Sequence, residues 1–284
     1  MSEGLSVFNV NANSDVGKAL VEKISAGIEG LVRPWQIKRI ASAQAEAEKI
    51  QALSQIEITE LERRAVNRFV AEELKKQNNM ESITEKAIPD LKPNAKPVEM
   101  NDDWITNFFD KCRIISDNEM QTLWAKILAG EANSPGSYSK RTVNLLGSLE
   151  KIEAQFFTTI CRFYWYSIEP IILDYEASIY ADLGINYSTL KHFDDIGLIT
   201  FNSFPGYVVK NQPQTITVSY FEKTIQLTFK QPKDNTLGIG FVSYSNVGRQ
   251  LSKICNVKPV DGFFDYVVKK WSDQGIKITN IGGE

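Results

Sequence analysis

The histidine count is the first limit on the chemistry that this sequence could support. His192 is the single histidine among 284 residues, so any Ser-His-Asp or Cys-His catalyst within one chain would have to use it. Zinc and iron sites built on several histidines are excluded for the same reason. A lone histidine is more often a surface or packing residue than a catalyst, and we expect no catalytic role for it.

Cysteines and short motifs point the same way. Cys112, Cys161 and Cys255 are far apart and odd in number, which argues against a disulfide framework or a CxxC metal site. Neither HExxH nor GxxxxGK[ST] occurs, and LGIGF (237–241) lacks the third glycine of a dinucleotide fingerprint. PDLK (89–92) is reminiscent of a metal-nuclease motif but lies in a predicted linker. We therefore expect no catalytic residue, metal or cofactor; an enzyme with a carboxylate-only magnesium site is the least supported alternative.

Three polar residues near a predicted turn invite a functional interpretation. Glu131, Ser139 and Arg141 flank a Pro-Gly pair and could form a site. The alternative is a helix cap from Ser139 together with a salt bridge that holds the loop. We favour this alternative, because local bonds to the backbone are the usual role of loop serines.

These residues belong to the stretch 102–166, in which the spacing of apolar side chains predicts four helices. We expect Ser116 and Glu119 to form a capping box at the start of the second helix. Gly130 is expected to end that helix, and Ser139 to cap the third. The fourth is expected over 148–166. The apolar positions that define these helices are Trp104, Ile105, Phe108, Phe109, Cys112, Ile115, Met120, Leu123, Trp124, Ile127, Leu128, Val143, Leu146, Leu149, Ile152, Phe156, Ile160, Phe163 and Tyr164.

A family resemblance starts in the same stretch. It rests on Trp124, Ala125, Ile127, Leu128, Gly130 and Glu131, followed by Pro135, Gly136, Ser139 and Arg141. This pattern resembles the bacterial family called domain of unknown function 2806, and LVRPWQIKRIASAQAEAEKI (31–50) is similar to the amino-terminal pattern of that family. The resemblance covers about half of the chain. It implies a bacterial origin and an association with accessory or defence genes, and it supplies no catalytic residues.

Residues 1–85 are predicted to form a long helical arm at the amino terminus. An amphipathic helix starts near residue 14, and a polar helical region rich in Ala, Glu, Gln, Lys and Arg spans 36–77. Helices this polar are poorly buried by their own chain, so we interpret them as a self-association or partner-binding arm. The alternative is a solvated helix folded back on the core. Residues 86–101, which contain three prolines, are the predicted linker to a core over 102–284.

A tryptophan among basic residues follows the amphipathic helix. Arg33, Trp35, Lys38 and Arg39 are candidate partner-binding residues. They could lie at a membrane surface, or they could contact a protein. We favour the protein, because the polar face of the preceding helix is mixed in sign.

The stretch 183–201 has the order of a winged-helix motif: a helix, a tight turn at Gly184, a second helix and a strand. We expect another helix before it, over 171–183, and a hairpin after it, over 204–209. Lys191, His192 and Lys210 are the candidate nucleic-acid-binding residues. Asp194 and Asp195 on the same helix would face phosphates, and binding depends on neutralising phosphates with Lys and Arg, so nucleic acid is the disfavoured alternative.

The last third of the chain is predicted to hold a small antiparallel β element. Residues 214–230 alternate with a period of two and predict a hairpin, and 237–244 predict a third strand. Ser245 or Asn246 is expected to cap a helix, and Asp261 a last helix that Gly275 ends. Residues 276–281 predict an edge strand.

Composition and charge complete the expectation. The hydrophobic share of 43% and the net charge of −3 are those of an ordinary globular protein and not of a general polyanion binder. No signal peptide or membrane span is recognisable, so we expect a soluble cytoplasmic protein. We expect an α+β fold that is mainly α, and an interaction or homo-oligomerising protein rather than an enzyme.

Overall fold

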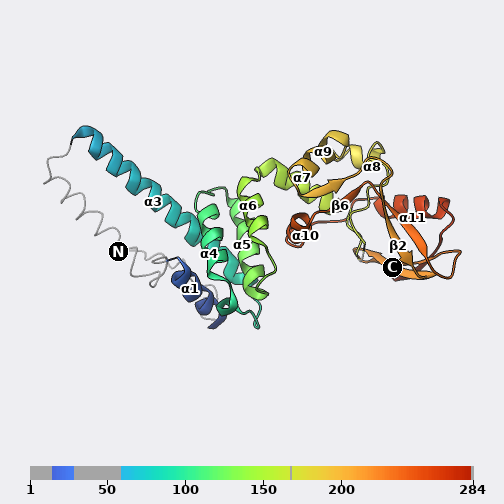
Figure 1. Cartoon of the computed structure of the whole chain (residues 1–284), viewed down its shortest axis with the longest axis horizontal. Coiled ribbons are helices and arrows are strands. Elements are labelled where there is room, and N and C mark those ends of the chain that lie inside the picture. Colours follow the sequence, from blue (N-terminus) through green and yellow to red (C-terminus); the bar gives the residue numbers. More distant parts are fainter. Residues whose placement is uncertain (1–14, 29–58, 167, 283–284) are drawn as a thin grey trace, which may run out of the picture. The chain divides into compact units, whose positions relative to one another are not determined.

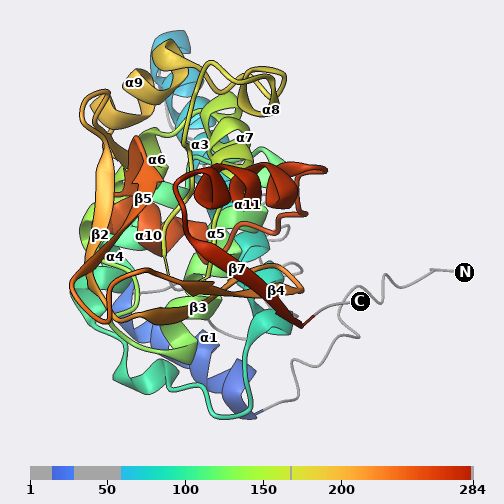
Figure 2. The same cartoon turned by 90° about the vertical axis from the view of Figure 1, so that its right-hand side faces the viewer.

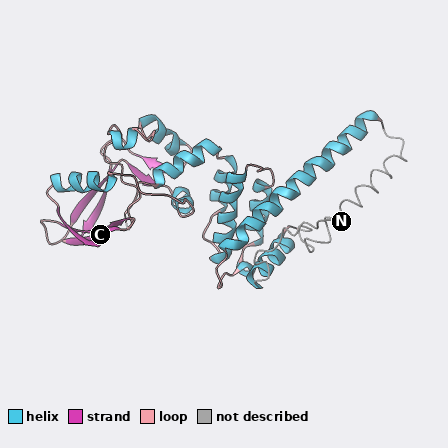
Figure 3. Ribbon diagram, turned by 180° about the vertical axis from the view of Figure 1, so that it is seen from behind, coloured by secondary structure: helices cyan, strands magenta, loops and turns pink. Residues whose placement is uncertain are grey.

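The computed structural model describes residues 15–28, 59–166 and 168–282. The chain divides into a first unit, Met1–Ser148, and a second unit, Leu149–Glu284. The described part of the first unit contains helices and loops, and the strands belong to the second unit (Figure 3). The fold is therefore α+β and mainly α, as predicted.

The helices of the first unit are shown in Figure 1. In chain order they are α1 (Asp15–Gly27), α3 (Glu60–Ala87), the short 3-10 helices η1 (Ile88–Asp90) and η2 (Pro97–Glu99), α4 (Asp102–Cys112), α5 (Asn118–Asn133) and α6 (Lys140–Ser148). An aromatic core joins α4 and α5: the Phe108 ring lies 5.0 Å from Trp104 and 5.1 Å from Trp124 between centroids. These buried residues are the apolar positions that the spacing predicted.

Two details of α5 differ from the prediction. Asp117 caps the helix instead of Ser116, since its Oδ1 accepts the N–H groups of Glu119 and Met120, both at 3.0 Å. Gly130 does not end the helix, which continues to Asn133. A Cβ at Gly130 would lie 2.6 Å from Cε2 of Tyr138, so this glycine makes room for the tyrosine ring.

The predicted boundary at 86–101 also differs from the structure, which divides the chain after Ser148. α3 continues to Ala87, and the proline-rich segment after it is tied to α5. The Lys96 N–H donates to the Ala132 carbonyl at 2.8 Å, and the Lys92 N–H donates to Asn133 Oδ1 at 2.7 Å. Prolines prevent a long helix here, but they do not prevent packing.

The amino-terminal helix α1 packs within the first unit and does not form part of a separate arm. Its Leu20 and Ile24 are fully buried. The Lys23 ammonium pairs with the Asp102 carboxylate at 2.7 Å, and the Thr106 hydroxyl donates to the Gly27 carbonyl at 3.1 Å. The apolar face predicted for this helix is thus used inside the protein.

The second unit combines short helices with small antiparallel sheets. Its elements are α7 (Lys151–Cys161), α8 (Ser178–Ala181), α9 (Tyr187–Asp195), β1 (Ile199–Phe201), β2 (Tyr207–Gln212), β3 (Thr215–Tyr220), β4 (Lys223–Thr228), β5 (Asn235–Gly240), β6 (Val242–Tyr244), α10 (Asn246–Ser252), α11 (Phe263–Asp273) and β7 (Lys277–Gly282). The strands pair as β1–β6, β2–β5 and β3–β4–β7. Figure 2 shows α11 beside the β3–β4–β7 sheet, whose hairpin and edge strand were predicted.

The predicted winged-helix order is present, but its strand pairing is not local. Gly184 adopts a left-handed φ of 78° between α8 and α9, and Asn186 caps α9 by accepting the Thr189 N–H at 3.0 Å. β1 pairs with β6, whereas β2, expected as the next arm of a hairpin, pairs with β5. The segment from β2 to β5 therefore lies, along the chain, between β1 and β6, the two strands that pair with each other after α9.

Two predicted helices are shorter in the structure. The helix expected over 148–166 ends at Cys161, and that expected over 171–183 is reduced to α8. Backbone pairing occupies the residues between them: the Phe241 N–H donates to the Ile172 carbonyl at 2.9 Å, and the Tyr166 N–H to the Ser219 carbonyl at 2.8 Å. Contacts with distant strands thus prevail over local apolar spacing.

Candidate functional site

The amino-terminal part of α3, residues 60–77, is largely exposed, and we call it the outer stretch. Every buried residue of α3 lies at Asn79 or beyond. In the outer stretch, by contrast, Leu61, Phe69 and Leu74 are 69%, 64% and 43% exposed. Figure 1 shows this part of α3 extending away from α4, α5 and α6. Three large apolar side chains on one exposed helix are a candidate contact surface.

Two of the three exposed apolar residues, Leu61 and Phe69, continue the side of α3 that is buried at its other end. Positions 61, 65 and 69 precede 79, 83 and 87 by about five helical turns each, because an α-helix has 3.6 residues per turn. Leu61, Ala65 and Phe69 therefore project to the same side as three residues buried in the first unit. One helix face is covered at its carboxyl end and exposed at its amino end.

The carboxyl end of α3, residues 79–87, is the inner stretch, and a polar network holds it. Asn79 Nδ2 donates to the Arg113 carbonyl at 2.9 Å and its Oδ1 accepts from Gln121 Nε2 at 3.3 Å. Gln121 Oε1 accepts from the Ser82 hydroxyl at 2.9 Å and also from the Lys86 ammonium. Burial lowers the pKa of Lys86. The sequence prediction placed Asn79 in the amino-terminal arm, outside the core, and missed this network.

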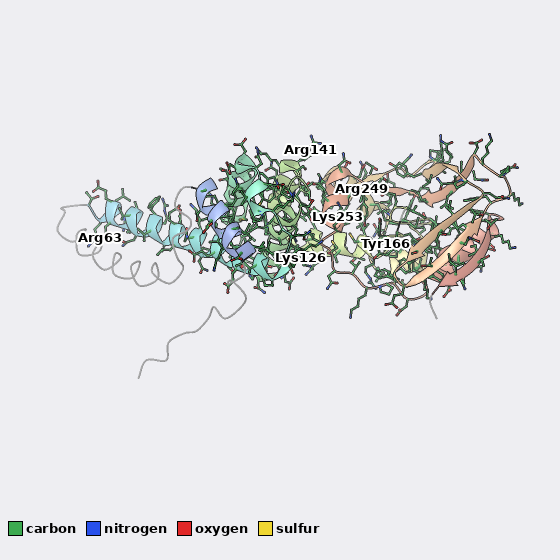
Figure 4. All side chains as sticks on the ribbon, turned by 90° about the horizontal axis from the view of Figure 1, so that it is seen from below. Arg63, Lys126, Arg141, Tyr166, Arg249 and Lys253 are labelled. Carbon is green, nitrogen blue, oxygen red and sulfur yellow. The ribbon has the colours of Figure 1, made fainter. Side chains whose placement is uncertain are left out.

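The charges of the outer stretch are balanced and largely satisfied along the helix. Residues 60–77 contain five cations and four carboxylates. Arg63, labelled at the outer end of α3 in Figure 4, pairs with Glu60, and Lys76 pairs with Glu73 at 2.6 Å. A capping box between Thr59 and Glu62 starts the helix. Balanced charge around apolar residues is typical of a protein contact and not of a phosphate-binding surface.

The candidate partner-binding residues Arg33, Trp35, Lys38 and Arg39 lie outside the described residues. Their predicted role in partner binding therefore stays a prediction.

The candidate nucleic-acid-binding residues do not form one basic surface. The Lys191 ammonium contacts Asp195 at 2.7 Å and Asp194 at 3.2 Å, and these hydrogen bonds raise the pKa of Lys191. His192 Nε2 lies 2.7 Å from Glu153 Oε1. Lys210 is exposed on β2, and no hydrogen bond or ion pair connects it with α9 among the described residues.

Two of the three polar residues around the Pro-Gly turn, Glu131 and Ser139, bond to the local backbone. Glu131 accepts the backbone N–H groups of Gly136 at 2.7 Å and Tyr138 at 2.9 Å. Burial raises the pKa of Glu131, against the effect of these hydrogen bonds. Ser139 Oγ accepts the Thr142 N–H at 3.2 Å and so caps α6, as predicted. In place of the expected salt bridge, the Glu131 carboxylate holds the loop by accepting these backbone N–H groups.

Other kinds of site find no support among the described residues. Across residues 15–28, 59–166 and 168–282, His, Cys, Asp and Glu form no group of three or more placed to hold a metal ion. In that same part of the chain no helix combines the length and the apolar character needed to cross a membrane.

Comparison with known proteins adds a family but no activity. The model of the family described as "Protein of unknown function (DUF2806)" matches residues 63–268, which is well over half of the chain. The match starts within the outer stretch of α3 and includes most of the second unit. No curated protein and no solved structure matches this chain.

Proposed function

The chain belongs to the DUF2806 family of proteins of unknown function, and because that family assigns no activity, we propose from its residues that it is a non-enzymatic interaction protein. In this proposal its amino-terminal helices mediate self-association or recruit a protein partner, and the outer stretch of α3 is one contact surface. A cytoplasmic role as a sensor or recruiting component of a bacterial defence or stress system is part of the same proposal.

One observation carries this proposal: the buried face of α3 continues into solvent with large apolar side chains. Leu61 and Phe69 lie on that face, and most of each side chain is exposed. Full burial of a leucine or phenylalanine side chain contributes about 1.5–3 kcal/mol. A partner that covers both residues therefore gains several times the thermal energy before any polar contact is counted.

The alternatives are less well supported by the same structure. A membrane-surface role through α1 would need its apolar face, but Leu20 and Ile24 are already buried within the first unit. Nucleic-acid binding through α9 would need free cations, but the ammonium of Lys191 is shared between two carboxylates. Both arguments favour a protein partner.

The test is the assembly state of the full chain with Leu61→Ser and Phe69→Ser combined. We expect the wild type to form a discrete assembly in native mass spectrometry and multi-angle light scattering, and the double variant to lose it. The double variant should keep the far-UV circular dichroism spectrum of the wild type, because both side chains are exposed and are not needed for folding. Val98→Ser, at a position that is 71% exposed in η2, is the matched control and should retain the assembly.

Two results would contradict the proposal. One is a wild-type chain that is monomeric and captures no stoichiometric protein. The other is a double variant with the assembly of the wild type. Point substitutions are sharper here than deletion of residues 1–85, because that deletion also removes the buried residues Asn79 and Ile83.

A further inference from the structure

The second unit carries a cluster of aromatic side chains at its surface, drawn from four separate segments. The ring of Tyr175 lies 5.3 Å from Phe241, 5.7 Å from Phe201 and 6.1 Å from Tyr187 between centroids. Tyr187 also contacts Phe201 at 5.4 Å. Tyr187 is 52% exposed, and the other three rings are half-buried. The rings thus support one another and still present a surface to solvent.

A fifth aromatic residue extends this surface. Phe204 is 87% exposed in the loop between β1 and β2. The same loop lies against the cluster: the Asn202 N–H donates to the Phe241 carbonyl at 2.9 Å, and a Cβ on Gly206 would lie 3.3 Å from Phe241 Cδ1. We call these five residues the aromatic cluster.

The surroundings of the aromatic cluster are acidic. Residues 168–210 contain six carboxylates and two lysines, and one of the carboxylates, Glu169, pairs with Arg249. Asp174 and Glu176 flank Tyr175 in the chain, and Asp194 Oδ1 accepts the Phe201 N–H at 3.2 Å. One of the two lysines, Lys191, is held by Asp194 and Asp195. The cluster therefore combines aromatic faces with a local excess of negative charge.

This combination selects among classes of partner. Nucleic acids and anionic lipid surfaces would be repelled, because both are bound through clustered Lys and Arg. A guanidinium or ammonium group is attracted to aromatic faces and to carboxylates alike. Apolar side chains gain from covering the exposed rings. A polypeptide that combines apolar residues with Arg or Lys can cover the rings and pair with the carboxylates at the same time.

We propose that the aromatic cluster is a docking surface for a polypeptide segment that combines apolar or aromatic residues with arginine or lysine. This surface belongs to the second unit and does not depend on the outer stretch of α3. The protein then has two contact surfaces of different chemistry, one with balanced charge and one acidic.

The experiment uses a phage-displayed library of random peptides, about twelve residues long, selected on the full chain. Counter-selection is made on the full chain carrying Tyr187→Ser and Phe204→Ser. We expect the enriched peptides to share an aromatic or aliphatic residue near Arg or Lys. Measured by fluorescence anisotropy as synthetic peptides, they should bind the double variant about tenfold or more weakly, as expected for loss of aromatic anchors.

Three further variants make the result specific. Ile152→Ser, on α7 and 53% exposed, matches Tyr187 in exposure and should leave peptide affinity unchanged. Asp174→Asn with Glu176→Gln should weaken binding about threefold and flatten its salt dependence. If the double variant melts at a lower temperature than the wild type, Phe204→Ser alone replaces it in the affinity measurement. The Phe204 side chain is almost fully exposed, so its loss should not affect folding.

Several outcomes would overturn the proposal. One is a selection that enriches no peptide dependent on Tyr187 and Phe204. Enrichment of acidic peptides would also do so. A third is a fluorescent single-stranded oligonucleotide or an anionic vesicle that binds the full chain and loses affinity in the same double variant. Each of these leaves the proposal for the outer stretch of α3 unaffected, because its assembly test uses other residues.

Discussion

The two ends of α3 share one helical face and differ in what surrounds it. The inner stretch places Asn79, Ile83 and Ala87 inside the first unit, whereas the outer stretch places Leu61, Ala65 and Phe69 on the same side of the helix in solvent. The inner stretch contacts α5 through a network of side-chain hydrogen bonds. The comparison shows that one helical face can serve stability at one end and remain available for a partner at the other.

The largest effect is expected at the centre of the inner stretch. Ile83 is fully buried, and truncation of a buried isoleucine to alanine costs about 2–5 kcal/mol through lost burial and an unfilled cavity. We expect Ile83→Ala to lower the free energy of unfolding by an amount in this range, measured by urea denaturation of the full chain. Leu61→Ala, on the same face of the outer stretch, should change that free energy by less than about 0.5 kcal/mol.

The comparison would fail if Leu61→Ala proved as destabilising as Ile83→Ala. The outer stretch would then contribute to folding of the first unit. A contact surface for a separate partner would have to be sought elsewhere.

A smaller effect is expected for the polar network of the inner stretch. Asn79→Ala leaves the Arg113 carbonyl and the Gln121 amide without this partner, and an unsatisfied buried polar group costs about 1–3 kcal/mol. Asn67→Ala, at an exposed asparagine of the outer stretch, is the control and should have little effect. Combining Asn79→Ala with Gln121→Ala in a double-mutant cycle should give a coupling free energy of about 0.5–3 kcal/mol. Strict additivity would show that the two residues act independently.

The inner stretch also shows where sequence analysis reaches its limit. An Asn-Asn pair before three prolines indicates a loop by local rules, yet Asn79 is helical and buried. Its partners Arg113 and Gln121 lie 34 and 42 residues away. No spacing rule reports such partners, so Asn79 was left outside the core that was predicted to start at residue 102.

In the second unit, too, local contacts were predicted from the sequence and contacts between distant segments were not. The β3–β4 hairpin follows from local alternation and was predicted, because its strands are adjacent in the chain. The pairing of β1 with β6 joins segments about forty residues apart, and local pattern predicted a nearer partner for β1. Tyr175, Tyr187, Phe201 and Phe241 likewise come together only in the fold. Helices and caps are predictable here because their determinants are local.

The smallest effect is expected in the pH dependence of the inner stretch. Burial lowers the pKa of Lys86, against the attraction of Glu85 and Asp117. A lysine whose pKa is lower in the folded protein than in the unfolded chain opposes folding while it is charged. Its contribution therefore becomes more favourable as pH rises through the folded pKa towards the ordinary value of about 10.4.

Lys86→Met removes this titration. We expect the difference in unfolding free energy, wild type minus Lys86→Met, to move in favour of the wild type as pH rises towards the ordinary lysine pKa of about 10.4, measured by urea denaturation at each pH. Other titrating groups cancel in this difference because both proteins contain them. The same series for Lys75→Met, an exposed lysine of the outer stretch, corrects for the loss of any lysine. A corrected difference that is constant or moves in the opposite direction would show that the Lys86 ammonium carries no cost of burial.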